Sequence, residues 1–145
     1  KKKYALSIGE QTAEMVKMEI GSALVTRDQL MTEVRGRDLV SGLPRDVVIK
    51  SNEIAEALTP HLLDIAASVQ NVFNTTPPEL VADIMEKGII LSGGGAELRH
   101  IDEFFRKMTG VSAYLSEEPL FCVAKGAGLI LSHLDVYKRT LLTKR

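Results

Sequence analysis

The chain has 145 residues, of which 45% are hydrophobic and 26% charged, and its formal net charge is −1. These values are typical of a folded domain with a buried core, and they exclude a disordered polyelectrolyte. Without a basic excess, nucleic acid is not indicated as a partner. The single cysteine, Cys122, cannot form an internal disulfide, which fits a reducing cytoplasmic setting. No apolar run is long enough to span a bilayer.

The first predicted element is a helix near the start of the chain. Apolar residues repeat at three- and four-residue spacings over residues 10–20, and Gly21 follows as a helix stop. A second stripe of this helix carries Glu10, Glu14 and Lys17. A row of charges at this spacing is usually a solvated face, so the stripe does not by itself indicate a site.

A β-hairpin and a long helix are predicted next. Alternating residues over 31–37 and a valine-rich run over 44–49 are typical of two antiparallel strands. The helix that follows can be capped by Ser51 or Asn52, and Pro60 falls inside it, which predicts a kink or a restart rather than one straight helix. Its sustained apolar stripe consists of Ile54, Leu58, Leu62, Ile65, Val69 and Val72.

The second half is organised around residues 89–97, with the sequence IILSGGGAE. A buried strand is predicted before Gly93, Gly94 and Gly95, and a helix is predicted directly after them, from about Glu97 to Thr109. Three residues without side chains let a ligand approach main-chain N–H donors, and a helix N-terminus would add positive potential. That pattern suits a phosphate or a nucleotide. The alternative is a tight strand-to-helix turn that needs glycine only for its dihedral angles.

The C-terminal third predicts a short strand over 111–115 and a last helix that begins at Pro119. This helix is rich in small residues over 124–128, which would let another backbone pack closely. The histidines His61 and His133 have no acidic or histidine partner at helical ligand spacing. The sequence therefore predicts no metal site.

Several stretches of this chain resemble the MreB/Mbl family of bacterial actin homologues. They are IGEQTAEMVK over 8–17, EVRGRDLVSGLP over 33–44 and TTPPELVADI over 75–84, together with the glycine element and Gly-Ala-Gly over 126–128. A strand that ends in three glycines occurs throughout the actin, Hsp70 and sugar-kinase superfamily. The segments 34–44 and 76–84 are more particular to MreB and Mbl, and the similarity extends over almost the whole chain.

The resemblance implies an α/β fold that is part of an actin-like ATPase domain of RNase H-like type. Residues 7–75 would form the small α+β subdomain IIB, consisting of a helix, a hairpin and the long helix. Residues 76–145 would form the remnant of subdomain IIA. Without the first hairpin of that subdomain, the strands at Ile89 and Val111 would have too few neighbours and an exposed edge. We expect self-association, swapping or a partner to cover it.

The resemblance also implies which residues contact a nucleotide. Gly93, Gly94 and Gly95 match the family's adenosine motif. The turn beside the adenine would be Ala96, Glu97 and Leu98, while Glu14 and Lys17, with Glu10 less strictly matched, would close the other side of the base. An adenine fits a flat slot between a glycine turn and side-chain stems, which agrees with the motif.

In the full-length family, the cofactor is ATP or ADP with Mg²⁺. The family's first domain, its phosphate-binding loops and the acidic residues that position metal and water have no counterpart in this sequence. Phosphoryl transfer requires phosphates, metal and water to be held together. We therefore expect the chain alone to bind adenine nucleotides weakly at best, to hydrolyse no ATP and to supply no catalytic residue.

Three functions are compatible with the sequence. The first is part of a filament subunit that determines rod shape by organising cell-wall synthesis, with itself and the wall-elongation machinery as partners. Such a protein would be cytoplasmic and would reach the membrane only through the absent first domain. The second is a lobe of another superfamily ATPase, such as a sugar kinase or Hsp70. The third is a truncated module that binds filaments without nucleotide.

Overall fold

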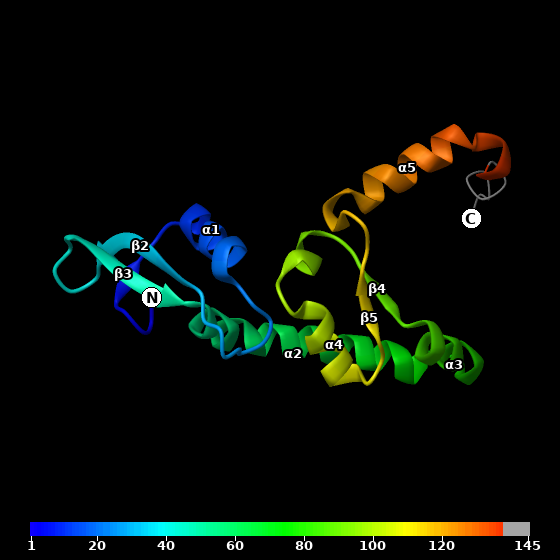
Figure 1. The fold of residues 1–145 in the computed structure, drawn as a ribbon, viewed down its shortest axis with the longest axis horizontal. Coiled ribbons are helices and arrows are strands. Elements are labelled where there is room, and N and C mark those ends of the chain that lie inside the picture. Colours follow the sequence, from blue (N-terminus) through cyan, green and yellow to red (C-terminus); the bar gives the residue numbers. More distant parts are fainter. Residues whose placement is uncertain (138–145) are drawn as a thin grey trace.

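A computed structural model describes residues 1–137 and has mixed α/β architecture (Figure 1). The first half contains the predicted helix and the predicted hairpin, and both are confirmed. Helix α1 packs on an antiparallel sheet of strand order β1-β2-β3 within the described residues. These elements are α1 (Glu10–Ile20), β1 (Leu6–Ser7), β2 (Met31–Asp38) and β3 (Pro44–Lys50).

A small hydrophobic core lies between α1 and this sheet. Val16 and Ile20 from α1 meet Val34 from β2, and all three are buried. Ile49 of β3 and Ile54 of the next helix pack against them. The strand periodicity of two and the helix periodicity of three to four residues place these side chains on facing surfaces, so the first half has a core of its own.

Helix α2 (Ser51–Thr75) runs along the base of the molecule and joins the two halves (Figure 1). The predicted restart at Pro60 is wrong, because the helix continues through it. Ala55 and Leu62 are buried on either side of the proline, and this packing holds the helix together across the missing N–H donor. The predicted caps are also wrong. Ser51 Oγ and Asn52 Oδ1 accept hydrogen bonds from the loop before β2 instead.

The second half is built on a two-stranded parallel sheet within the described residues. Strands β4 (Ile89–Leu91) and β5 (Ala113–Leu115) pair in register, and helix α3 (Pro78–Lys87) precedes them. Helix α4 (Ile101–Thr109) packs against β5 and α2. A second core forms between these elements, and its buried members are Ala23, Leu62, Ala66, Ile101, Phe104 and Phe105. Since α2 contributes to both cores, the division between residues 75 and 76 stays a prediction.

The helix predicted to begin at Glu97 begins later. The glycines lead into a short 3-10 helix, η1 (Gly94–Glu97), and α4 starts only at Ile101. Leu98 is extended, Arg99 forms a parallel β-bridge with Ser22, and His100 has a left-handed conformation with φ of 60°, so these residues are not helical. The N-terminus of α4 therefore does not adjoin the glycines, and the expected helix-end contribution to anion binding is absent there.

The last described helix departs from the rest of the molecule. A 3-10 turn, η2 (Pro119–Phe121), replaces the predicted start of this helix, and α5 (Cys122–Ser132) follows. Figure 1 shows α5 projecting away from the sheet. Across residues 1–137, no helix is both long and apolar enough to span a membrane.

Candidate functional site

A pocket of about 930 Å³ lies between the two halves of the molecule. One wall is the outer face of α1, and the opposite wall is the glycine turn with η1. The floor consists of apolar side chains from α2 and α4. The residues that line it are Glu14, Lys17, Met18, Gly21, Leu58, Leu62, Ile65, Ile90, Leu91, Ser92, Gly94, Gly95, Ala96, Glu97, Leu98, Arg99, Ile101, Phe105 and Leu120.

Most of the residues predicted to contact a nucleotide meet in this pocket. Those that line it are Glu14, Lys17, Gly94, Gly95, Ala96, Glu97 and Leu98. The other two do not. Gly93 does not line the pocket, and Glu10 lines a second hollow with Gln11, Glu14 and Met15, so Glu14 borders both. The structure thus brings two predicted segments, about 80 residues apart in the sequence, to opposite walls of one pocket; their role toward a nucleotide stays a prediction.

Glycine is required for a different reason at each of the three positions in the turn. Gly93 has φ of 83°, a conformation that side chains disfavour, so it makes the turn. A Cβ on Gly94 would lie 3.2 Å from Leu120 Cδ2, whereas a Cβ on Gly95 would meet no atom within 4 Å. Gly95 therefore leaves room in the pocket rather than avoiding a clash.

Some main-chain N–H groups of the glycine turn are bonded to carbonyl groups of the protein, and others have no acceptor among the described residues. The N–H of Gly93 donates to the Pro119 carbonyl at 2.8 Å, and that of Ala96 donates to the Gly93 carbonyl at 3.0 Å. Within residues 1–137, the N–H groups of Gly94 and Gly95 form no hydrogen bond to the backbone or to a side chain. These two donors border an apolar pocket, where a polar ligand atom could accept from them.

The α1 wall is charged but not rigid. Lys17 Nζ lies 2.7 Å from Glu14 Oε2, and both side chains are about half exposed. The charged stripe is therefore solvated, as expected for charges at this spacing, and Glu14 and Lys17 also line the pocket. Its aliphatic stems supply a surface on which a flat ring could lie.

A guanidinium group fixes the separation of the two walls. Arg99 Nε donates to the Gly21 carbonyl at 2.9 Å, and its Nη2 donates to the Ile20 carbonyl. The N–H of Ala23 donates to the Arg99 carbonyl at 2.8 Å. These bonds satisfy carbonyl groups at the C-terminal end of α1 and attach them to the segment that follows η1. Arg99 thus holds the glycine turn at a set distance from α1.

Sequence reasoning missed Arg99 and the apolar floor. Nothing in the neighbourhood of Arg99 distinguishes it from a surface arginine, since its acceptors are carbonyls almost 80 residues earlier. Leu58, Leu62 and Ile65 were predicted as part of one core stripe. In the structure this stripe is shared between the second core and the pocket.

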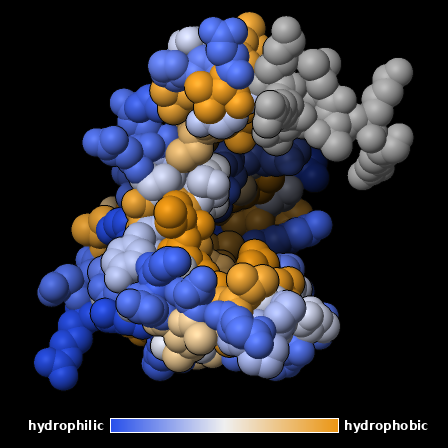
Figure 2. Space-filling model, turned by 90° about the vertical axis from the view of Figure 1, so that its right-hand side faces the viewer, coloured by the Kyte–Doolittle hydropathy of each residue, from blue (hydrophilic) through white to orange (hydrophobic). Residues whose placement is uncertain are grey.

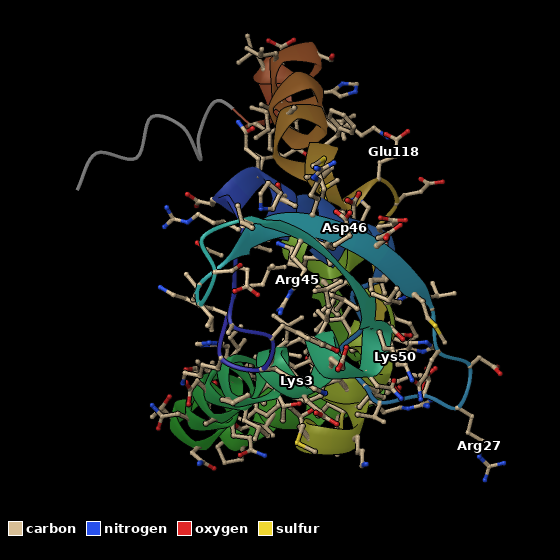
Figure 3. All side chains as sticks on the ribbon, turned by 90° about the vertical axis from the view of Figure 1, so that its left-hand side faces the viewer. Lys3, Arg27, Arg45, Asp46, Lys50 and Glu118 are labelled. Atoms are coloured by element: carbon tan, nitrogen blue, oxygen red, sulfur yellow. The ribbon has the colours of Figure 1, made fainter. Side chains whose placement is uncertain are left out.

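An ion pair holds the N-terminal segment at the end of the molecule away from the pocket. Figure 3 views the molecule from this end and labels Lys3. Glu53, in the first turn of α2, is bonded to Lys3, to the Tyr4 hydroxyl at 2.7 Å and to the Lys50 N–H at 2.9 Å. Burial raises the pKa of Glu53, but the hydrogen bonds from Lys3, the Lys50 N–H and Tyr4 outweigh it, and the pKa falls to about 2. This anchor ties the N-terminal segment to α2, away from the pocket.

The pocket suits the base of a nucleotide better than it suits a metal ion. It combines an apolar floor, free N–H donors and a wall without a side chain at Gly95. Among the described residues, no group of three or more His, Cys, Asp or Glu side chains could hold a metal ion. The apolar floor and the free donors therefore fit an adenine ring, and the described residues offer no cluster of ligands for Mg²⁺.

Comparisons with known proteins agree on one family. The model of the MreB/Mbl protein family matches residues 1–139. The chain is 42% identical over 144 residues to the cell shape-determining protein MreB of Escherichia coli, covering 99% of this chain and 42% of that protein. It is 39% identical over 135 residues to the cell shape-determining protein Mbl of Bacillus subtilis, covering 93% and 40%.

Solved structures give the same result. MreB5 of Spiroplasma citri, bound to ADP, is 35% identical with a TM-score of 0.89, covering 97% of this chain and 42% of that one. The double helical filament of MamK is 22% identical with a TM-score of 0.57, which supports the actin-like fold alone. The chain spans about two fifths of the length of the relatives it matches. The family match, the identity and the fold together establish that this chain belongs to the MreB/Mbl family.

Proposed function

We propose that this chain forms the adenine side of the nucleotide site of an actin-like protein that determines cell shape. The observation that carries the proposal is the single pocket in which the α1 stripe faces the glycine turn. Two structures of the similar MreB5 from Spiroplasma citri, one bound to ADP and one to AMPPNP, support it, because each matches 97% of this chain.

In this proposal, the adenine lies between η1 and α1. Ala96 and Leu98 supply apolar contact on one side, and the stems of Glu14 and Lys17 cover the other. The N–H groups of Gly94 and Gly95 donate to polar atoms of the nucleotide. Arg99 acts as a positioning residue, since it holds both walls and need not touch the ligand.

Hydrolysis belongs to the complete protein in this proposal. The described residues include no cluster that could hold a metal ion, and the chain spans 42% of its Escherichia coli relative. Family membership also argues against a sugar-kinase or Hsp70 lobe. We also propose that the whole protein is cytoplasmic and associates with the membrane. Its proposed partners are further copies of itself and the wall-elongation machinery.

Titration calorimetry of the 145-residue chain with ADP and AMPPNP tests the proposal. We expect saturable binding with a dissociation constant on the order of 0.1–1 mM, because the pocket holds the base of the nucleotide and gives little contact to the rest of it. Gly95→Leu should abolish it, since the new side chain would enter the pocket without meeting protein atoms at its Cβ. Gly9→Leu is the matched control, because its Cβ also meets no atom within 4 Å and it does not line the pocket. Binding that survives Gly95→Leu would contradict the proposed site.

A further inference from the structure

Three residues of α1 and the glycine that ends this helix line the pocket. They are Glu14, Lys17, Met18 and Gly21, related by spacings of three, four and seven residues, so one face of α1 points toward the glycine turn. Glu14 and Lys17 form an ion pair with each other. Met18 is the uncharged side chain of this face, since Gly21 has none, and it is 74% exposed.

The two walls of the pocket meet where α1 ends. A Cβ on Gly21 would lie 2.1 Å from the Lys17 carbonyl oxygen and 3.1 Å from Leu98 Cδ1. The missing side chain therefore lets the segment after η1 approach α1, and Leu98 closes this end of the pocket. Met18 lies about one turn before Gly21, so along the helix it stands between the closed end and Glu14.

The opposite wall also exposes apolar side chains. Ile90 and Leu120 line the pocket and are 75% and 56% exposed. Figure 2, which faces the end of the molecule that carries α3 and α5, shows apolar residues gathered around a hollow. The pocket thus has apolar groups on both walls as well as on its floor. A flat ring bound between the walls would cover apolar surface that is otherwise in contact with water.

The side chain of Met18 is suited to contact with an aromatic ring. Methionine is unbranched and flexible, so its thioether can move from solvent onto a bound ring while α1 stays in place. Contacts between a thioether sulfur and an aromatic ring are favourable, and the side chain loses exposed apolar surface at the same time. The neighbouring Glu14 and Lys17 differ, because their charged ends remain in water while only their stems lie against the ring.

We propose that Met18 is a binding residue of this site and that its side chain folds over the base of a bound adenine nucleotide. The inference rests on the proposed nucleotide site and adds the side chain that changes its exposure when the nucleotide binds. In the free chain Met18 is open to solvent, and in the complex its sulfur lies against the ring. The contact is made to the base, so a ligand without a base does not cover Met18.

Oxidation by hydrogen peroxide, read by peptide mass spectrometry with and without saturating ADP, tests the contact. One oxygen atom passes from the peroxide to the thioether sulfur, which gives the sulfoxide and water. Four of the five methionines are exposed to a similar extent: Met18 at 74%, Met15 at 61%, Met31 at 58% and Met85 at 56%. Without ADP, these four should be oxidised at similar rates.

ADP should slow the oxidation of Met18 by about three- to tenfold, because the ring covers its sulfur. The rates at Met15, Met31 and Met85 should stay unchanged, and these three are internal controls because none of them lines the pocket. Adenosine, which carries the base without phosphates, should protect Met18 as ADP does. Ribose 5-phosphate, which carries no base, should leave its oxidation rate unchanged.

Substitution of Met18 provides a second measurement. Met18→Ala should raise the dissociation constant of ADP by about three- to tenfold, whereas Met18→Leu keeps an apolar side chain of similar volume and should stay within about twofold of the unmodified chain. Met31→Ala is the matched control, because Met31 is 58% exposed and lies on β2 outside the pocket. Circular dichroism verifies that the variants fold, as expected for substitutions at exposed positions.

Three results would overturn the inference while the nucleotide site itself stands. They are ADP binding by calorimetry without a slower oxidation of Met18, equal protection of Met18 by ribose 5-phosphate, and an unchanged ADP affinity in Met18→Ala. Failure of the inference is thus distinguishable from failure of the proposed function. If the unmodified chain does not bind ADP in calorimetry, both are wrong.

Discussion

The two halves of this molecule differ in how completely they bury their own apolar surface. In the first half, α1 covers the three-stranded sheet, and Val16, Ile20 and Val34 are buried between them. In the second half, α4 covers one face of the β4–β5 sheet, Ile90 and Tyr114 on the other face are exposed, and no residue of α5 is buried within the described residues. The first half thus buries a core between helix and sheet, whereas the second half leaves one sheet face and its last helix uncovered within the described residues. The pocket lies where the two halves meet.

The largest expected effect separates the covered and uncovered sides of the second half. Phe104 is 3% exposed in the second core, and Phe121 is 58% exposed before α5. Phe104→Ala should lower the free energy of unfolding by about 3–5 kcal/mol, and Phe121→Ala should change it by less than about 0.5 kcal/mol. Urea denaturation at low protein concentration measures both. Equal losses would mean that α5 and η2 are packed in solution.

The next effect concerns the link between the halves. Arg99→Gln removes the donors to the Ile20 and Gly21 carbonyls and should cost about 1–3 kcal/mol of unfolding free energy. It should also weaken ADP binding, because the two pocket walls would no longer be held together. Arg106→Gln, at an exposed position of α4, is the control. If ADP affinity is equal in the two variants, Arg99 does not position the walls.

A smaller effect tests the anchor that completes the first half. The pKa of Glu53 falls to about 2, so its stabilisation is fully present above its ordinary pKa of 4.5 and is lost as pH falls through about 2. We expect the unfolding free energy to decrease over this window by about 1–2 kcal/mol, since exposed Lys3 is screened by solvent. Glu53→Gln should remove most of that dependence, and Glu56→Gln should not. An unchanged pH profile in Glu53→Gln would show that the anchor does not form.

The smallest effect is expected on the charged wall. Lys17→Met breaks the ion pair with Glu14, which is half exposed and should contribute less than about 0.5 kcal/mol to stability. The aliphatic stem remains, so ADP binding should decrease less than in Gly95→Leu. Thermal denaturation and calorimetry measure the two quantities. A loss of several kcal/mol in stability would mean that α1 depends on this pair.

The sequence predicted the elements better than it predicted their connections. Period-two and helical patterns identified the hairpin and α1, and an apolar run identified the strand before the glycines. The predicted burial of that strand is wrong for Ile90, which is 75% exposed. The restart at Pro60 was wrong because packing on both sides of the proline overrides its local effect. The early start of α4 was wrong because Arg99 bridges to Ser22 and His100 is left-handed, so neither residue is helical. Both errors come from contacts distant in sequence.

In the candidate site, too, residues in local motifs could be predicted, whereas residues that depend on contacts between distant segments could not. The glycine turn and the α1 stripe could be named from motifs and from the family resemblance, and seven of those residues line one pocket. Arg99 and the apolar floor could not be named, because their role depends on which segments of the folded chain face one another. Gly93 and Glu10 belong to the predicted set but do not line the pocket. Gly93 makes the turn, and Glu10 lines the neighbouring hollow that Glu14 also borders.

Amide NMR spectra of the chain, recorded while ADP is added, are the most direct test of a nucleotide site between α1 and the glycine turn. We expect the amide signals of Gly94, Gly95 and Ala96 to move together with that of Lys17, because both walls contact one ligand. Signals from the β2–β3 hairpin, which does not line the pocket, should stay in place. Shifts confined to the hairpin, or an absence of shifts at millimolar ADP, would contradict a nucleotide site between α1 and the glycine turn.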